Sequence, residues 1–558
     1  MNVSLIVCAS LAALFSATCF TPSFDGSFWA FPLSLLFVAL VAIASFRFAR
    51  RPERKRLSVL RKCLEYLPFV LFAAFVVRRS GADETGFILD LASVVLWLAV
   101  SVVDVTILAR LSEKRVARLY PDLGPAVKPR WTVAAQILEW VDALLQAACL
   151  VLLINLFIFQ LYAIPSESMV PEFMIGDRVI VLKTPSGPKF PLTDVGIPRM
   201  RSYKRGDIVV FSNPHYNDTK ADRVKSFASQ LVYMLTFTSV NINRDEMGNV
   251  KADPLVKRIT GVPGEKLMLV DGVLYSRRAG DREFAPVADD ARWAAWNLDV
   301  LPQSERALVK TIPMTKKDYD ELLSIESMRA NLDEAEAAGT CREIAARFER
   351  LKPVADTVTD PGDLFPLKER DYFDLFSKND EVARKLLTTN GGAAWFRAFM
   401  TDWTRDPARE NLYEREAFHV NLMMKIDLGY LILRDAELFA ANATANQFDE
   451  DAIRVNLLSN ANGYAFFMAY YDQRNMMEFP AGDGNFIPAD SYFMMGDNRF
   501  NSLDMRHSYE KRRIAIDRKD PWSLAYVSYL APQYVPVTRI LGSAQFRFWP
   551  LSRAGKPE

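Results

Sequence analysis

The sequence predicts a multi-span α-helical membrane region followed by a mostly-β domain with an α-helical insertion. Apolar runs of bilayer-spanning length are confined to the N-terminal part of the chain. Beyond them, short alternating segments typical of strands flank a long helix-like stretch. We therefore expect the membrane region at residues 1–162, the two parts of the β domain at 163–277 and 485–558, and the insertion at 278–484.

The composition excludes several classes of protein. The chain has 68 basic and 67 acidic residues, so no strongly basic face is available for nucleic acid. It has five cysteines, and only Cys341 lies beyond the apolar N-terminal third, so the polar part cannot form an internal disulfide. No CxxC pair or cysteine–histidine cluster offers a zinc site, and we expect neither a metal nor a cofactor.

Apolar runs predict the membrane helices. A transmembrane helix needs about 20 apolar residues. Four runs approach that length: Val3–Phe20, Phe28–Phe46, Phe87–Ala109 and Ala143–Ala163. Tyr66–Val77 is shorter and is typical of an interfacial or short tilted segment. Val3–Phe20 could be a cleaved signal peptide, but no basic residue precedes it and apolar runs follow at once, so we expect it to be retained as the first span.

Basic residues in the short loops predict the orientation, because such loops stay in the cytoplasm. They form two groups: Arg47, Arg50, Arg51, Arg54, Lys55, Arg56, Arg61 and Lys62 before Tyr66, and Arg110, Lys114, Arg115, Arg118, Lys128 and Arg130 before the last run. Both loops can be cytoplasmic only if Tyr66–Val77 also crosses the membrane, although Arg78 and Arg79 argue against this. The chain would then be a multi-pass protein of the cytoplasmic membrane, with everything after Ala163 on the periplasmic or extracytoplasmic side.

Four acidic residues lie near the ends of these runs: Asp90, Asp104, Glu139 and Asp142. An acid inside a membrane often marks a functional site. Near the end of a span the headgroup region can solvate it, so we interpret these four as interfacial.

Alternating, β-branched segments predict the strands of the polar part. These are Asp177–Leu182, Ile208–Phe211, Lys266–Val270, Tyr492–Met495 and Ser543–Trp549. Asp271-Gly272 between two apolar segments predicts a hairpin turn. Ser212–Asp253 interrupts the β pattern, and its Phe227–Val240 segment fits neither a helix nor a strand pattern.

The insertion has a helical pattern. Thr315 followed by Asp318 predicts a capped helix start, and Glu326–Leu351 is rich in alanine, glutamate and arginine. An apolar stripe at helical spacing is more typical of a core face than of a cofactor site; it comprises Trp395, Phe396, Phe399, Met400 and Trp403. We expect the insertion to be a tolerated surface addition, with a lid or a docking platform as alternatives.

Candidate catalytic residues begin directly after the last apolar run, in the stretch Ile164–Pro171, which contains Ser166 and Ser168. A serine nucleophile needs a base. The histidines are scattered and none has an obvious aspartate partner, and no Gly-x-Ser-x-Gly motif is present. Lysine is the alternative base in Ser–Lys enzymes. Lys257 stands in an apolar strand-like run in which Lys257 and Arg258 should point to opposite faces, although both could be exposed on an edge strand.

Four segments, in order, resemble the motifs of type I signal peptidase (leader peptidase), the bacterial-type Ser/Lys membrane protease. They are Ser166–Pro171, Tyr203–Phe211, Val256–Glu265 and Gly496–Arg506. Four ordered motifs behind a membrane exit make the resemblance specific. The large insertion and the extra N-terminal spans are additions to that pattern.

The resemblance implies a membrane-bound serine endopeptidase that removes signal peptides from exported preproteins through an acyl-enzyme. It implies that Ser168 is the nucleophile and Lys257 the general base. The Ser166 hydroxyl and the Ser168 backbone N–H would form the oxyanion hole, and Ser502 would orient the lysine amine.

The resemblance also implies supporting and substrate-binding residues. Arg258 would pair with Asp497 and Asp504 with Arg506, which would hold the last motif in place. Shallow pockets for small side chains at substrate positions −1 and −3 would be lined by Ile164, Met169 and Val256. Three positions depart from the family's pattern, namely Phe173, Met505 and His507.

The chemistry requires a lysine with a lowered pKa, because the ordinary value of about 10.4 is too high for a base near neutral pH. Burial can lower the pKa by about 3–5 units, and apolar Val256 and Ile259 flank Lys257. The expected partners are exported preproteins, the lipid bilayer and the secretion translocon, and not nucleic acid.

Two other functions fit parts of the sequence. Self-cleaving repressors also use a Ser–Lys pair, but they are cytosolic and linked to DNA, which the membrane spans and the balanced charge argue against. A non-catalytic membrane scaffold could retain the fold, and its sign would be the loss of Ser168 or Lys257. Both residues are present.

Overall fold

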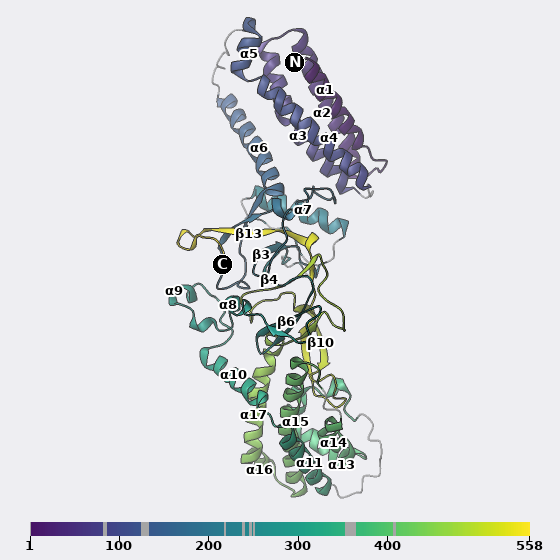
Figure 1. Cartoon of the computed structure of the whole chain (residues 1–558), viewed down its shortest axis with the longest axis vertical. Helices are drawn as coiled ribbons and strands as arrows, with labels where there is room; N and C mark the ends of the chain where they lie inside the picture. The colour runs from purple at the N-terminus through teal and green to yellow at the C-terminus, as the bar shows by residue number, and fades with distance from the viewer. Residues whose placement is uncertain are drawn as a thin grey trace.

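Three regions follow one another along the long axis of the molecule (Figure 1). A bundle of apolar helices lies at one end, the sheets lie in the middle, and a mainly helical region lies at the other end. The structure is a computed structural model that describes residues 2–81, 86–123, 133–216, 219–236, 240, 242–244, 248, 251–351, 364–405 and 409–558.

The N-terminal region is helical. Its helices are α1 (Asn2–Thr18), α2 (Ala30–Arg50), α3 (Arg54–Ser80), α4 (Phe87–Arg110), α5 (Glu113–Leu119) and α6 (Val133–Phe157). Among the described residues, three helical segments are long and apolar enough to cross a membrane: Gly26–Arg50, Phe87–Arg110 and Gln136–Phe157. Helix α1 is equally apolar in character but shorter, and it packs against α2 and α4.

Helix α3 differs from the short interfacial segment expected at Tyr66–Val77. It runs for 27 residues, which is about 40 Å at 1.5 Å per residue, and it packs between α2 and α4. Its charged N-terminal half extends beyond the apolar part. There Arg54 and Arg61 contact Glu113, at 2.7 and 3.2 Å. The two basic loops therefore meet at the same end of the bundle.

The opposite end of the bundle contacts the β region. Arg79 donates a hydrogen bond of 2.9 Å to the Leu192 carbonyl, and Phe190 packs in a cluster with aromatic residues of α3, α4 and α6. Arg78 is buried and lies 2.5 Å from Asp90. These contacts explain why the basic residues Arg78 and Arg79 occur in the last turn of α3. They also correct the interfacial interpretation of Asp90, which is 3% exposed inside the bundle, as Asp104 is at 1%.

The last apolar run also ends earlier than expected. Helix α6 stops at Phe157, and the end of the predicted span Ala143–Ala163 forms strand β1 (Phe159–Ala163). The helix terminus is capped by the chain that follows strand β2 (Arg178–Leu182): Lys183 Nζ donates to the Asn155 carbonyl and Thr184 Oγ1 to the Phe157 carbonyl, at 3.0 and 2.8 Å. These contacts satisfy carbonyls that have no partner within the helix, so the chain can leave the helix and pair with β2.

Among the described residues the strands form three antiparallel sheets, two of which make up the β region. The seven-stranded sheet has the order β1-β2-β13-β3-β4-β9-β12. Its other strands are β3 (Ile208–Phe211), β4 (Leu255–Gly261), β9 (Ser491–Met495), β12 (Val535–Pro536) and β13 (Ile540–Trp549). The four-stranded sheet has the order β7-β6-β5-β8. Its strands are β5 (Glu265–Val270), β6 (Val273–Arg278), β7 (Ala285–Pro286) and β8 (Met476–Phe479).

All five predicted strands are confirmed: one has the predicted bounds, and the other four begin one to three residues away from the predicted start. The predicted hairpin is also confirmed, because Val270 pairs with Val273. Asp271 and Gly272 have φ values of 51° and 78°, the left-handed backbone that a two-residue turn between antiparallel strands requires. Segments from both sides of the insertion pair in the seven-stranded sheet, where β4 lies next to β9.

The helical region lies between β7 and β8 in the chain. Its helices are α8 (Asp290–Trp293), α9 (Gln303–Arg306), α10 (Lys316–Ala330), α11 (Glu334–Leu351), α12 (Tyr372–Ser377), α13 (Asn379–Thr388), α14 (Gly392–Thr401), α15 (Leu412–Ala440), α16 (Ala445–Asp449), α17 (Ala452–Ala469) and α18 (Tyr471–Arg474). The capping box of Thr315 and Asp318 is confirmed at the start of α10. The predicted apolar stripe is buried in one hydrophobic core.

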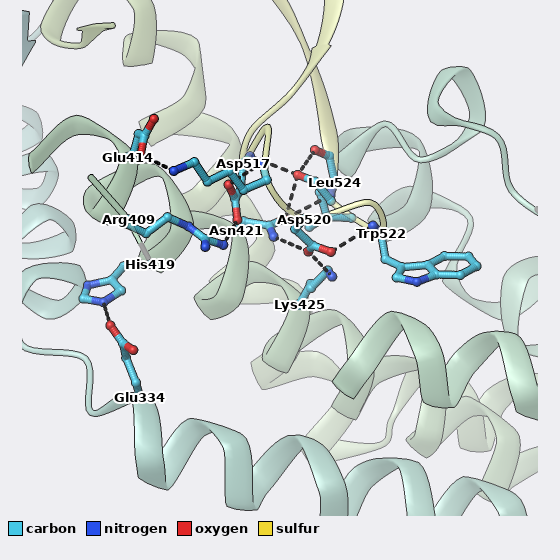
Figure 2. Close-up of polar contacts among 12 residues, drawn as sticks. Glu334, Arg409, Glu414, His419, Asn421, Lys425, Asp517, Asp520, Trp522 and Leu524 are labelled. Carbon is cyan, nitrogen blue, oxygen red and sulfur yellow. Dashed lines mark hydrogen bonds and ion pairs between the residues drawn. The ribbon is translucent and has the colours of Figure 1, made fainter. Parts of the chain in front are cut away.

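A hairpin from beyond the insertion completes this helical core. Its strands are β10 (His507–Ala515) and β11 (Ala525–Leu530), and its loop docks on α15 (Figure 2). Lys425 forms a fully buried ion pair with Asp520, and Asn421 donates a hydrogen bond of 2.8 Å to the same carboxylate. Arg409 lies 2.5 Å from Asp517. The buried charges join the insertion to the C-terminal part of the chain.

The substitution Lys425→Met tests this connection. It leaves the Asp520 carboxylate buried without its cation, which costs about 3–5 kcal/mol. We expect the helical region to unfold at a lower urea concentration, and tryptophan fluorescence would measure the midpoint of unfolding. The matched variant Lys378→Met removes an exposed lysine 3.9 Å from Asp374 and should change stability by about 1 kcal/mol or less. Equal midpoints for the two variants would contradict the account.

Candidate active site

Ser168 and Lys257 lie side by side, Ser168 in a loop and Lys257 on a strand of the seven-stranded sheet. Ser168 lies in the loop between β1 and β2, residues 164–177, which we call the serine loop. Lys257 lies on β4, where it is paired with Val209 of β3. Lys257 Nζ is 2.5 Å from Ser168 Oγ. The two residues are thus close enough for direct proton transfer.

The surroundings of Lys257 favour its neutral form. Burial lowers the pKa of Lys257 to about 8, although the carboxylates of Asp504 and Asp497 act in the opposite direction. The side chain is only 2% exposed. The amine can therefore lose its proton at a pH near neutrality, as a general base must.

The two other predicted serines approach this pair in different ways. Ser166 is exposed, and its Oγ lies 3.4 Å from Ser168 Oγ. Ser502 is buried, and its Oγ has no hydrogen-bond partner within the described part of the chain. The structure brings Ser502 to the site, but it gives no hydrogen bond between Ser502 and Lys257.

Gly496 allows the last motif to lie in close contact with the serine loop. A Cβ atom at this position would lie 2.2 Å from Ser502 Oγ and 2.3 Å from the Ser168 carbonyl oxygen. The same carbonyl accepts a hydrogen bond of 3.2 Å from the Asn498 N–H. The backbone of the last motif thus touches the backbone of the serine loop, and no other residue type fits at Gly496.

Both predicted ion pairs are present and buried. Arg258 donates two hydrogen bonds to Asp497, at 2.9 and 2.6 Å, and points away from Lys257, as strand alternation predicts. Arg506 donates two hydrogen bonds of 2.9 Å to Asp504. Burial opposes ionisation of Asp504, but Arg506 holds the pKa of this carboxyl well below its usual range. A further pair, Arg205 with Glu265 at 2.7 Å, joins the second and third motifs.

A cavity of about 500 Å³ opens beside the Ser168–Lys257 pair. Its lining includes the three residues predicted to bind substrate, Ile164, Met169 and Val256. The positions that depart from the family's pattern are buried and do not line this cavity; they are Phe173, Met505 and His507. Phe173 packs in the same apolar cluster as Ile164 and Met169.

Helix α7 (Lys220–Leu235) forms the opposite wall, and sequence reasoning missed it. It covers part of the unassigned Phe227–Val240 segment and contacts α3 and α6. Ser226, Ser229, Gln230 and Tyr233 of this helix line the cavity. The available signal was Thr219, whose side chain caps the first turn by accepting from the Asp222 N–H.

Comparison with known proteins identifies relatives of the region that holds this site. Residues 137–291 and 445–549 match the model of the family described as signal peptidase, peptidase S26. The unmatched residues between these two segments lie in the helical region.

Several curated relatives carry the name signal peptidase I. The protein of Buchnera aphidicola subsp. Schizaphis graminum is 43% identical over 75 residues, 13% of this chain and 24% of the relative. The Bacillus licheniformis protein is 27% identical over 139 residues, 25% of this chain and 50% of the relative. The Pseudomonas aeruginosa protein is 26% identical over 162 residues, which is 28% of this chain and 53% of the relative. The chain thus spans between about a quarter and half of their lengths, and the resemblance to type I signal peptidases is confirmed.

The substitution Gly496→Ala tests the geometry of the site. The added methyl group would displace the Ser168 carbonyl or Ser502, and a misplacement of this size costs about 100-fold in rate. We expect that loss in the rate at which a p-nitrophenyl ester acylates Ser168. The control is Gly339→Ala, because Gly339 has no atom within 4 Å of an added Cβ. A wild-type rate for Gly496→Ala would contradict the close contact.

Proposed function

We propose that this chain, a relative of the type I signal peptidases, is a membrane-bound serine endopeptidase that cleaves signal peptides from exported preproteins. The observation that carries the proposal is the 2.5 Å contact between Ser168 Oγ and buried Lys257 Nζ, in a cavity near the end of an apolar helix. A signal peptide is itself an apolar segment that ends near the membrane surface, so its cleavage site would reach this cavity.

In the proposed reaction Ser168 is the nucleophile and Lys257 the general base. Neutral Lys257 takes the proton of the Ser168 hydroxyl, and Oγ forms a bond to the scissile carbonyl carbon. When the tetrahedral intermediate collapses, the C–N bond breaks and the Lys257 ammonium gives its proton to the leaving amine. The signal peptide stays esterified to Ser168. Lys257 then takes a proton from water, whose oxygen attacks the ester carbon. When this second tetrahedral intermediate collapses, the C–Oγ bond breaks, the Lys257 ammonium returns the proton to Ser168 Oγ, and the signal peptide is released as a carboxylate.

The serine loop supplies the groups that would stabilise the intermediate. The Ser166 hydroxyl and the Ser168 backbone N–H are proposed to donate to the oxyanion, and such a donor is worth about 3–4 kcal/mol. Ser502 is proposed to orient the Lys257 amine during turnover, which is consistent with its buried Oγ having no hydrogen-bond partner among the residues that the structure describes. The Arg258–Asp497 pair joins β4 to the last motif, and the Asp504–Arg506 pair lies within that motif.

The direction of the chain suggests how a substrate binds. From the end of α6 the chain runs through β1 to Ser168, away from the bundle. A peptide that leaves the membrane and is cut at Ser168 would run the same way, as an added strand beside residues 163–166 and β4. Small residues at −1 and −3 would then contact Ile164, Met169 and Val256, and earlier residues would pass α7.

The basic loops suggest the side of the membrane. They lie at the end of the bundle opposite the sheets (Figure 1), and such loops are retained in the cytoplasm. We therefore propose that the protein is a multi-pass protein of the cytoplasmic membrane whose catalytic region is extracytoplasmic. Preproteins delivered by the secretion translocon would be its substrates.

The pH dependence of kcat/KM tests the role of Lys257, because kcat/KM reports the free enzyme. Lys257 has a pKa of about 8, and only its neutral form accepts a proton. We expect kcat/KM to fall about tenfold per pH unit below pH 8 and to level off above it. His507, whose pKa burial lowers to about 4, stays neutral throughout. A flat profile from pH 6 to 9 would argue against a lysine base.

Cleavage of a preprotein with an Ala-x-Ala site, by protein purified in detergent, tests the function itself. We expect cleavage after the last alanine, with a loss of at least about 1,000-fold in both Ser168→Ala and Lys257→Ala. The matched controls are Ser377→Ala and Lys378→Ala, two adjacent exposed residues of the helical region, which should cleave as wild type. Cleavage that persists in Ser168→Ala would contradict the mechanism. A folded wild type that does not cleave would favour a scaffold.

A further inference from the structure

Glu167 stands between the two serines of the site, and its side chain contacts the helical insertion. Its residue is only 6% exposed. The carboxylate accepts hydrogen bonds from the backbone N–H groups of Lys310 and Thr311, the latter at 3.1 Å. Asn501 of the last motif donates a longer hydrogen bond of 3.4 Å. No ion pair with Glu167 occurs among the described residues, so backbone donors stabilise this buried charge.

The donors belong to residues 295–312, which we call the linking segment because it contacts two motifs of the site. It begins with Ala295, whose N–H donates to the Asp497 carbonyl at 2.8 Å and whose carbonyl accepts from the Arg499 N–H at 3.1 Å. Apolar side chains of the serine loop, Val170 and Met174, pack against Leu298 of this segment. The linking segment is thus bonded both to the serine loop and to the last motif.

Asn498 of the last motif forms hydrogen bonds with the backbone of the serine loop. Its side-chain amide donates to the Glu167 carbonyl at 3.0 Å, and its backbone N–H donates to the Ser168 carbonyl at 3.2 Å. The backbone from Glu167 to Ser168 is therefore held by Asn498, while the Glu167 side chain is held by the linking segment. The proposed oxyanion donors, on Ser166 and Ser168, flank this point.

We infer that Glu167 is a positioning residue through which the insertion holds the serine loop in its reactive geometry. The inference rests on the proposed function of Ser168, and it gives the first part of the insertion a role beyond that of a surface addition. Hydrogen bonds to a charged acceptor are stronger than those to a neutral one. Loss of the charge would therefore let the loop move, and misplaced oxyanion donors would lower kcat more than they change KM.

The substitution Glu167→Gln tests the inference, because glutamine keeps the size but removes the charge and offers one oxygen to two donors. We expect kcat for preprotein cleavage to fall about tenfold, with KM changed by less than twofold. The same loss is expected in acylation of Ser168 by a p-nitrophenyl ester. Amide hydrogen exchange at Lys310 and Thr311 should become faster, since both N–H groups lose a charged acceptor.

The matched control is Asp299→Asn. Asp299 lies in the same linking segment and accepts from the Lys316 N–H at 3.0 Å, but among the described residues it has no hydrogen bond to the serine loop. We expect wild-type kcat for this variant. Equal effects of Glu167→Gln and Asp299→Asn on kcat would overturn the inference, because the role would then be general stability.

The donor side gives a second test. Thr311→Pro removes one N–H that reaches Glu167, and it should lower ester acylation of Ser168 in the wild-type background but not further in Glu167→Ala. Additive losses would overturn the inference. Because the ester needs no signal peptide, a wild type that acylates but does not cleave preproteins would contradict the proposed function alone.

Discussion

The contact between a buried lysine and a half-buried serine sets the constraints on the rest of the site. Lys257 can act as a base near neutral pH only if burial away from water lowers its pKa. The sheet provides this burial because β4 lies between β3 and β9. The neighbouring Arg258 points the other way, where Asp497 at 2.6 Å and Glu172 at 3.7 Å compensate its buried charge. Gly496 then allows the last motif to approach Ser168. Burial lowers the pKa of Lys257, and the packing around Gly496 places the last motif beside Ser168.

The three regions of the molecule meet around this contact. The helix α6 ends just before β1, so the serine loop begins close to the apolar bundle. Phe190 and Arg79 attach the β region to the same end of the bundle. On the far side, the linking segment reaches Glu167 and the β10–β11 hairpin joins the helical core. The proposed active site thus has contacts with both the helical bundle and the insertion.

The sequence was sufficient where the pattern is local. Strand alternation identified the predicted strands, the hairpin turn and the opposite directions of Lys257 and Arg258, and the ordered motifs identified the Ser168–Lys257 pair. The end of α6 was missed because Phe159–Ala163 is as apolar as a helix, and its capping group, Lys183, comes from another strand. Helix α7 was missed although Thr219 offered a local capping signal. The hydrogen bonds of Glu167 were missed because their donors, such as Thr311, are distant in the chain, and no periodicity connects them to the serine loop.

The covalent intermediate gives the most direct test of the central claim, that Ser168 is the nucleophile and Lys257 its base. Full-length protein would be mixed with an Ala-x-Ala preprotein, quenched in acid within milliseconds to seconds, digested and analysed by mass spectrometry. The account predicts an ester between the signal-peptide carboxyl carbon and Ser168, which is absent in Lys257→Ala. An ester on Ser166 or another residue, or cleavage by wild type with no ester at any time, would contradict it.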